Sequence, residues 1–231
     1  MTTLVIATRN RHKTEEIRAV LGPSINFLSL ANFPEAPGVI EDGNTFAANA
    51  AKKAIALAKW LEENAHGRLE APAWVLADDS GLEVDALGGL PGVHSARLAA
   101  LDSNGPGHAN SSDAANNSKL LRLLADVPTE QRTARFRCVL ALASIRLGTR
   151  GPRLSAEADR PVELFEGACE GHMLFAPRGE AGFGYDPLFQ PEGYAASFAE
   201  LGEAVKNGIS HRAKALARLP GRLAGRAVEL S

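Results

Sequence analysis

Two adjacent carboxylates, Asp78 and Asp79, directly follow a short apolar run at residues 74–77. The run is typical of a buried strand, and Ser80 and Gly81 come next. Carboxylates at such a strand end can hold Mg²⁺ through oxygen or take a proton from water. Acids at strand ends also commonly cap backbone donors in a turn. Taken alone, the pair leaves catalysis and capping equally open.

The backbone around this pair decides where the two carboxylates point. Successive side chains of an extended strand face opposite sides, so Asp78 and Asp79 share one cleft only if the chain turns beside them. Gly81 permits such a turn. We therefore expect the strand to end at the acids. Glu41, which precedes a long helical pattern, either favours that helix's dipole or adds a second carboxylate for a metal.

A cluster of basic and polar residues lies between an apolar run at residues 4–7 and a helical pattern that contains Ile17. The order strand, loop, helix presents backbone N–H groups at a helix N-terminus, and basic side chains strengthen that anion-binding geometry. A solvated basic turn is the competing interpretation. Short polar side chains that can donate to phosphate oxygens favour a phosphate site. The residues of this predicted loop are Thr8, Arg9, Asn10, Arg11, His12 and Lys13.

Glycines bracket an aromatic pair at residues 182–187, with the sequence GFGYDP. Aromatic rings presented on a loop suit stacking against a nucleobase. The alternative is a loop that tucks a ring, such as Phe183, into the core, and we expect this for one of the two rings. The helix predicted at about 204–219 is rich in Lys, Arg and His, and no acid occurs between residues 205 and 228. This pattern favours an anionic partner over charge complementarity with the helix dipole.

The remaining pattern supplies the elements that must position these groups. Residues 26–30 predict a strand, 45–64 a helix with an Ala-rich face, and 133–145 with 162–171 a long hairpin that extends the sheet or forms a dimer surface. Residues 103–117 and 148–160 read as loops, the first before a helix around 120–125. A Ser-His nucleophile at His94 and Ser95 is discounted, because adjacent residues seldom face each other.

Composition bounds the function. The chain has 231 residues, with 25 basic and 27 acidic side chains and a net charge of −2, which argues against general binding to nucleic acid or a membrane surface. Its two cysteines form no C-x-x-C motif, so neither a disulfide framework nor a thiolate metal site is indicated. No apolar run is long enough to span a membrane. We therefore expect a cytoplasmic protein without nucleic-acid or membrane partners.

Together, the acid pair, the basic loop, the aromatic loop and the basic helix fit a binding site for a nucleoside triphosphate with its magnesium ion. Four motifs occur in order: A-T-x-N-x-x-K, A-D-D-S-G-L-x-V-D-x-L-x-G-x-P-G-x-x-S-A-R, G-F-G-Y-D-P and K-x-x-I-S-H-R. From residue 4 to about residue 217 the chain thereby resembles the XTP/dITP diphosphatase family. The resemblance implies a single α/β domain over residues 1–231, with a mixed central sheet, flanking helices and two lobes around a long nucleotide-binding cleft. It also implies a homodimer that uses one or more Mg²⁺ per subunit to hydrolyse ITP, dITP or XTP to the monophosphate and pyrophosphate.

The same resemblance implies residue roles. Asp79 would be the catalytic carboxylate and a metal ligand, and Ser80 would touch the substrate. Glu41, which the residue pattern alone offers as a second carboxylate, is our candidate for the second metal ligand. The basic loop would hold the triphosphate. The implied contacts to base, sugar and phosphate near the carboxyl end are Phe183, Gly184, Tyr185, Asp186, Lys206, His211 and Arg212.

Two positions depart from the family pattern. Arg9 stands where glycine is common, which leaves phosphate binding plausible because a guanidinium forks onto phosphate. Ala48 stands where the pattern T-F-x-E-N-A carries Glu, so metal support from that helix is in doubt. Two other functions fit parts of the pattern. A nucleotide sensor would not need acids beside the phosphate, and a different phosphohydrolase would release another product.

Overall fold

One mixed six-stranded sheet, in the order β2-β1-β3-β4-β5-β6, organises the chain. The computed structural model describes residues 1–65, 67–102, 110–147 and 161–223. The strands are β1 (Thr3–Ile6), β2 (Asn26–Ser29), β3 (Ala73–Val84), β4 (Thr133–Ser144), β5 (Val162–Met173) and β6 (Phe189–Pro191). Strand β1 pairs in parallel with β2 and β3, whereas β5 and β6 are antiparallel. The mixed α/β sheet expected from the family resemblance is therefore confirmed.

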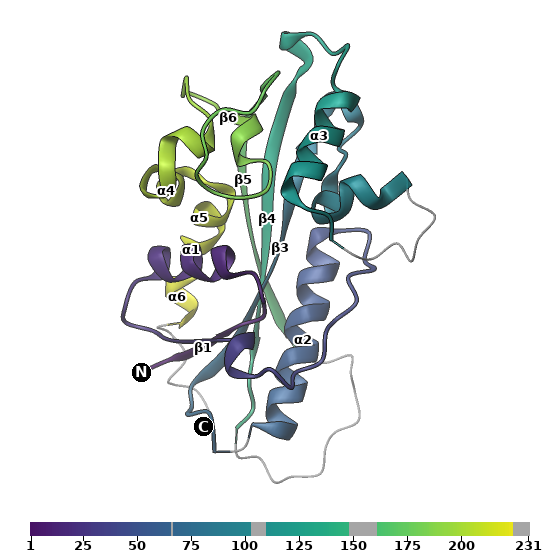
Figure 1. Cartoon of the computed structure of the whole chain (residues 1–231). Helices are drawn as coiled ribbons and strands as arrows, with labels where there is room; N and C mark the ends of the chain where they lie inside the picture. The colour runs from purple at the N-terminus through teal and green to yellow at the C-terminus, as the bar shows by residue number, and fades with distance from the viewer. Residues whose placement is uncertain (66, 103–109, 148–160, 224–231) are drawn as a thin grey trace. The chain divides into compact units, whose positions relative to one another are not determined.

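Helices flank this sheet (Figure 1). The α-helices are α1 (Arg11–Leu21), α2 (Phe46–Asn64), α3 (Asp113–Leu123), α4 (Phe198–Ile209), α5 (His211–Leu216) and α6 (Pro220–Leu223). Short 3-10 segments are η1 (Leu30–Asn32), η2 (Asp85–Leu87), η3 (Gly92–Asp102), η4 (Thr129–Gln131) and η5 (Asp186–Leu188). Within the described part of the chain, none of these helices combines the length and the apolar character needed to cross a membrane.

The chain divides into two compact units. Unit 1 comprises residues 1–79, 139–166 and 215–231, and unit 2 comprises residues 80–138 and 167–214. Strands β3, β4 and β5 each contribute residues to both units. Each unit therefore has its own core and its own set of polar contacts.

The core of unit 1 forms where apolar strands meet an Ala-rich helix. All four residues of β1 are buried, as expected of a parallel strand that is covered on both faces. Helix α2 begins after Thr45, whose hydroxyl oxygen accepts the Ala48 N–H at 3.1 Å, so the predicted start of this helix is confirmed. Its small buried residues, such as Ala50, Ala54 and Ala58, permit close approach of the helix backbone.

The core of unit 2 is aromatic. Phe136 packs edge-on against Phe189 with ring centroids 4.7 Å apart, and Phe198 lies 5.3 Å from Phe189. Leucines of β3, η3 and α3 surround these rings. This cluster joins side chains of β4, β6 and α4, and so anchors the segments that carry the predicted aromatic loop and basic helix.

Several element boundaries differ from the sequence-based expectation. Helix α3 begins at Asp113, earlier than predicted, because the Ser112 hydroxyl accepts the Ala115 N–H and caps it there. The predicted single helix at 204–219 is wrong, since Ser210 adopts an extended backbone and separates α4 from α5. The predicted strand pair 133–145 and 162–171 is confirmed by β4 and β5, which are neighbours in the sheet. The loop predicted at 148–160, and residues 103–109 of the other loop, lie outside the described residues.

Candidate active site

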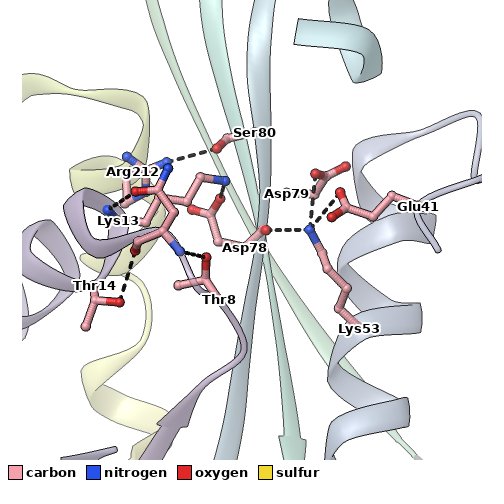
Figure 2. A network of polar contacts seen from close by, with 10 residues as sticks. Thr8, Lys13, Thr14, Glu41, Lys53, Asp78, Asp79, Ser80 and Arg212 are labelled. Atoms are coloured by element: carbon pink, nitrogen blue, oxygen red, sulfur yellow. Dashed lines mark hydrogen bonds and ion pairs between the residues drawn. The ribbon is translucent and has the colours of Figure 1, made fainter. Parts of the chain in front are cut away.

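Asp78 and Asp79 lie in the middle of a long strand and not at its end. Strand β3 continues to Val84, and Gly81 keeps an extended backbone inside it. The expected turn is therefore wrong, and the strand pleat sends the two carboxylates to opposite faces. Figure 2 shows Asp78 turned toward Lys13 of α1 and Asp79 turned toward Lys53 of α2. The two acids therefore have different ion-pair partners.

Lys13 anchors the first of these carboxylates. Its ammonium group pairs with Asp78 Oδ1, and the Asp78 side chain is fully buried. Helix α1 begins at Arg11, so Lys13 lies in its first turn. The prediction that Lys13 belongs to the preceding loop is therefore wrong. Asn10 caps the helix by accepting the Lys13 N–H at 3.1 Å, and Thr8 Oγ1 accepts the Asn10 N–H at 3.1 Å. These two bonds fix the chain direction into the helix and aim Lys13 at β3.

The other basic residues of the predicted phosphate loop have partners of their own. Arg9 donates from Nη2 to the Ala36 carbonyl at 3.0 Å. Arg11 pairs with Glu15 at 2.7 Å along the exposed side of α1, and His12 is exposed. Lys13 is thus the basic side chain of this segment that joins the network around β3.

Lys53 is a member of this polar network that sequence reasoning missed. Its ammonium group lies 2.8 Å from the Asp78 carbonyl, 3.1 Å from Glu41 Oε2 and 3.3 Å from Asp79 Oδ1 (Figure 2). The Lys53 side chain is only 11% exposed. A signal was present, because Lys53 stands one helical turn from buried Leu57 on the apolar face of α2. A lysine on such a face needs a buried anionic partner.

Glu41 reaches this lysine because the loop before α2 is tied down. Asn49 of α2 accepts the Gly43 N–H at 2.8 Å and donates to the Gly43 carbonyl at 3.3 Å. A Cβ at Gly43 would stand 2.7 Å from Asn49 Oδ1, so the close approach requires glycine. The neighbouring Asp42 pairs with Lys52 on the surface. Glu41 and Asp79 therefore converge on one ammonium group, and their expected role as metal ligands stays a prediction.

Burial makes Asp79 a weaker acid than usual. Loss of solvent raises the pKa of Asp79 from 3.8 to about 6, and the negative charge of Glu41 adds to this, while Lys53 and Lys13 oppose it. Burial alone would also raise the pKa of Glu41, but the attraction of Lys53 outweighs it and lowers that pKa. Among the described residues, buried Asp79 Oδ2 has no hydrogen-bond partner. The site thus holds a carboxylate with one oxygen left for a ligand.

This arrangement fits a magnesium ion that arrives with other ligands. No group of three or more His, Cys, Asp or Glu residues is placed to hold a metal ion in the part of the chain that the structure describes. Mg²⁺ usually keeps several waters and takes one or two carboxylates together with substrate phosphates. The spare oxygen of Asp79 and the nearby Glu41 meet that requirement.

Unit 2 contains a second polar group, built around a buried arginine. Arg212, in the first turn of α5, is 1% exposed and donates from Nη2 to Ser80 Oγ at 2.9 Å. Ser80 directly follows Asp79 along β3. His211 stacks on Phe136 with ring centroids 4.9 Å apart. The predicted residues Ser80 and Arg212 are therefore brought together, and His211 is held against the aromatic core.

The aromatic loop is tied to the predicted basic helix through Asp186. Lys206 of α4 pairs with Asp186 Oδ2 at 2.5 Å, and the same oxygen accepts the Phe183 N–H at 2.9 Å. The Lys206 ammonium lies 4.4 Å from the centre of the half-buried Phe183 ring. A Cβ at Gly182 would stand 2.2 Å from Asp186 Oδ2, so this turn requires glycine. Phe183, Asp186 and Lys206 thus form one unit.

One aromatic ring of the loop is buried, as expected, and it is Tyr185. It is 4% exposed and its hydroxyl donates to the Ser95 carbonyl at 2.9 Å. Burial raises the pKa of Tyr185. Ser95 uses its own hydroxyl to accept the Leu82 N–H and to donate to the Gly92 carbonyl. These bonds make Ser95 a structural hub, consistent with discounting it as a nucleophile.

The predicted basic helix does not present a solvated cationic face. Lys206, His211 and Arg212 are each less than 5% exposed, because they face partners in unit 2 and not water. The carriers of exposed charge are residues further along, such as Lys214 and Arg218. The basic stretch is therefore divided between buried groups with defined partners and ordinary surface charge.

Comparison with known proteins gives a family match over most of the chain. The Ham1 family model matches residues 4–221. A dITP/XTP pyrophosphatase of Geobacillus kaustophilus is 48% identical over 220 residues, which cover 95% of this chain and 93% of that protein. A dITP/XTP pyrophosphatase of Geobacter sulfurreducens is 47% identical over 230 residues, which cover 99% of this chain and 100% of that protein.

Solved structures give the same result. A HAM1 protein from Coxiella burnetii superposes with a TM-score of 0.75 at 33% identity, over 96% of this chain and 98% of that one. A nucleoside-triphosphatase, dITP/XTP pyrophosphatase, from Mycobacterium abscessus has a TM-score of 0.65 at 34% identity, over 94% and 98%. The resemblance read from the four motifs is confirmed, and the chain belongs to the Ham1 family.

Proposed function

We propose that this chain is a nucleoside triphosphate pyrophosphatase that hydrolyses non-standard purine nucleotides (ITP, dITP and XTP) to the monophosphate and pyrophosphate. Such an activity would cleanse the nucleotide pool. The observation that carries the proposal is Asp79, a buried carboxylate with an unpartnered oxygen, in contact with Lys53 and close to Glu41. Relatives that align over nearly the whole chain are named dITP/XTP pyrophosphatases, which supports the same substrate class.

The cations of unit 1 suit a triphosphate. Cleavage between the α and β phosphates consumes one water and builds negative charge on the leaving pyrophosphate. Lys13 pairs with Asp78 and Lys53 with Asp79, yet the charges of both lysines act on Asp79. Because carboxylates hold both ammonium groups before any ligand arrives, the lysines need little reorganisation to stabilise the charge on the leaving pyrophosphate. The amide groups at the start of α1 add a favourable dipole. These groups bind the phosphates and orient them for attack.

Asp79 is the group that we assign to the proton transfer. With a pKa of about 6, its carboxylate is mostly ionised at neutral pH and can accept a proton from the attacking water. Magnesium, held by Asp79 and Glu41 together with the phosphates, would supply Lewis-acid neutralisation of the phosphate charge. Asp78 stays paired with Lys13 on the other face of β3, so we assign it a positioning role.

Unit 2 provides groups that suit recognition of a 6-oxopurine. Phe183 offers a half-buried ring for base stacking, while Lys206 and Arg212 are cationic donors placed around it, the latter with its guanidinium carbon 6.0 Å from the ring centre. Adenine has an amino group in place of O6, so it would leave such buried donors unpaired. We therefore propose discrimination against adenine nucleotides through these donors.

A turnover panel tests the proposed function. ITP, dITP, XTP and the four standard ribonucleoside triphosphates would be incubated with the chain and Mg²⁺, with pyrophosphate and monophosphate quantified by chromatography. We expect high kcat/KM for the first three, and at least a 100-fold preference for ITP over ATP, on the order that a lost polar contact allows. Binding without turnover would indicate a sensor, and release of orthophosphate would indicate another phosphohydrolase.

Four further points belong to this proposal. We propose that the chain works as a homodimer in the cytoplasm, and that neither nucleic acid nor a membrane is its partner. The near-neutral charge balance supports the last two points. Light scattering coupled to size exclusion would decide the oligomeric state, with a monomer mass of 24.4 kDa as the reference. A single peak at the monomer mass across the micromolar range would contradict the dimer.

A further inference from the structure

Two side chains of helix α3 form hydrogen bonds with the backbone of one glycine, Gly184, in the aromatic loop. Asp113 Oδ2 accepts the Gly184 N–H at 2.7 Å, and Asn117 Nδ2 donates to the Gly184 carbonyl at 3.0 Å. Asp113 and Asn117 stand four residues apart, so both project from the same side of α3. The peptide groups of Gly184 therefore find their partners on a helix about 70 residues earlier in the chain, since the recorded separations are 71 and 67 residues.

Gly184 lies between the two aromatic residues of the loop in the sequence. Gly184 has a φ of +62°, a left-handed conformation, and it connects Phe183 to Tyr185. Its backbone angle thus decides how the Phe183 ring is presented after Tyr185 has been fixed in the core. The Phe183 N–H is held by Asp186, so the Asp113 and Asn117 bonds complete the restraint of the segment. Without them, the glycine is free to sample other conformations.

Helix α3 is itself a rigid support. Asn116 accepts the Ala99 N–H at 2.9 Å and donates to the Ala96 carbonyl at 3.3 Å, which ties α3 to η3. Leu120 is fully buried in the core of unit 2. Consecutive asparagines thus hold two different segments, η3 through Asn116 and the aromatic loop through Asn117. The Tyr185 hydroxyl also donates to η3, to the Ser95 carbonyl, so the aromatic loop is bonded to both α3 and η3.

We propose that Asp113 and Asn117 are positioning residues for nucleobase binding, because they hold Gly184 so that Phe183 is presented in its binding conformation. This inference rests on the proposed function for its ligand, an oxopurine nucleotide. Neither residue needs to touch that ligand. They act by raising the fraction of molecules whose loop is competent to bind.

The expected change in KM follows from the fraction of molecules whose aromatic loop is in the binding conformation. A hydrogen bond to a charged acceptor is worth more than a neutral one, and its loss allows roughly a tenfold fall in the competent fraction. The apparent affinity falls by the same factor. Asp113→Ala should therefore raise KM for dITP about tenfold and leave kcat within about twofold, since the catalytic groups of unit 1 are untouched. Asn117→Ala should raise KM by a smaller factor, because it breaks a neutral bond.

The experiment compares four variants by two readouts. Hydrogen–deuterium exchange reports the amides of residues 182–186, and steady-state kinetics with dITP reports KM and kcat. Asp113→Asn keeps an acceptor oxygen for Gly184 and should restore both values to near those of the wild type. Ser118→Ala, at an exposed position of α3 whose hydroxyl accepts a hydrogen bond from Arg122 of the same helix, serves as the matched control and should change neither. Melting temperatures show that all four fold.

The outcomes separate this inference from the proposed function. Faster exchange at 182–186 together with a raised KM in Asp113→Ala, reversed in Asp113→Asn, supports positioning. Unchanged exchange, or faster exchange with an unchanged KM, overturns it, as does an equal fall in kcat. A wild-type chain that releases no pyrophosphate from any oxopurine nucleotide refutes the proposed function instead, and the exchange data then still decide whether α3 holds the loop.

Discussion

Replacing Asp79 with asparagine should stabilise the metal-free protein while it removes activity. Burial raises the pKa of Asp79 from 3.8 in the ordinary state to about 6 in the folded chain. Because the folded state then binds the proton more tightly, the ionised carboxylate costs stability, and the full cost corresponds to about 3 kcal/mol at about 1.4 kcal/mol per pKa unit. Asparagine carries no charge and avoids this cost. We also expect kcat to fall by a factor on the order of 10² to 10⁴.

The sign of the effect sets the pH window. With a folded pKa above the unfolded one, the stability contribution of Asp79 is complete below pH 3.8 and is lost as pH rises through about 6. Between pH 5 and pH 8 the remaining loss is on the order of 1.5 kcal/mol. The gain in free energy of unfolding from Asp79→Asn should therefore be larger at pH 8 than at pH 5 by this amount.

Urea unfolding at the two pH values, with a chelator present, measures this difference. Asp85→Asn is the matched control, because its hydrogen bond from Arg135 lowers the pKa of Asp85. The contribution of Asp85 is lost only as pH falls below its ordinary range, so the control should show no change between pH 5 and pH 8. An Asp79→Asn gain that is equal at both pH values, or larger at pH 5, would refute the reasoning about burial.

Three other substitutions probe the remaining parts of the site. Lys53→Met should lower both kcat and the melting temperature, because it leaves two close carboxylates without their shared ammonium; an unchanged melting temperature in a thermal scan would contradict this. Gly182→Ala should raise KM at least several-fold in dITP kinetics, since its Cβ would stand 2.2 Å from Asp186 Oδ2, and a normal KM would count against the loop geometry. Tyr185→Phe should lower the free energy of unfolding by about 1 kcal/mol through loss of its bond to the Ser95 carbonyl, with urea titration as the check and no loss as the contrary result.

The elements with strong local patterns could be predicted from the sequence. Strand β1, helix α2 and the neighbouring strands β4 and β5 follow from continuous apolar runs or helical spacing, which need no distant partner to interpret. The family motifs singled out Asp79, and the position of Glu41 before a long helix suggested a second carboxylate; the roles of both residues stay predictions. Local pattern and motif spacing therefore carried the fold class, and the structure brings the two acids together on Lys53.

What could not be predicted depended on partners distant in the chain. An acid pair inside a strand reads as a strand end, yet β3 continues because Lys13 and Lys53 neutralise the two faces from separate helices. The prediction of one continuous basic helix at 204–219 was wrong for the same reason. Lys206 and Arg212 are buried by partners on other elements, Asp186 and Ser80, so the chain breaks between α4 and α5 to place both. Long-range ion pairs and hydrogen bonds overrode local propensity at each of these points.

The most direct measurement of the central claim is product stoichiometry from dITP in the presence of Mg²⁺. We expect the wild-type chain to release pyrophosphate and dIMP in equal amounts, and Asp79→Asn, folded and at the same concentration, to release them more slowly by a factor on the order of 10² to 10⁴. Release of orthophosphate with dIDP, or undiminished turnover by Asp79→Asn, would contradict the assignment of this buried carboxylate to pyrophosphate release.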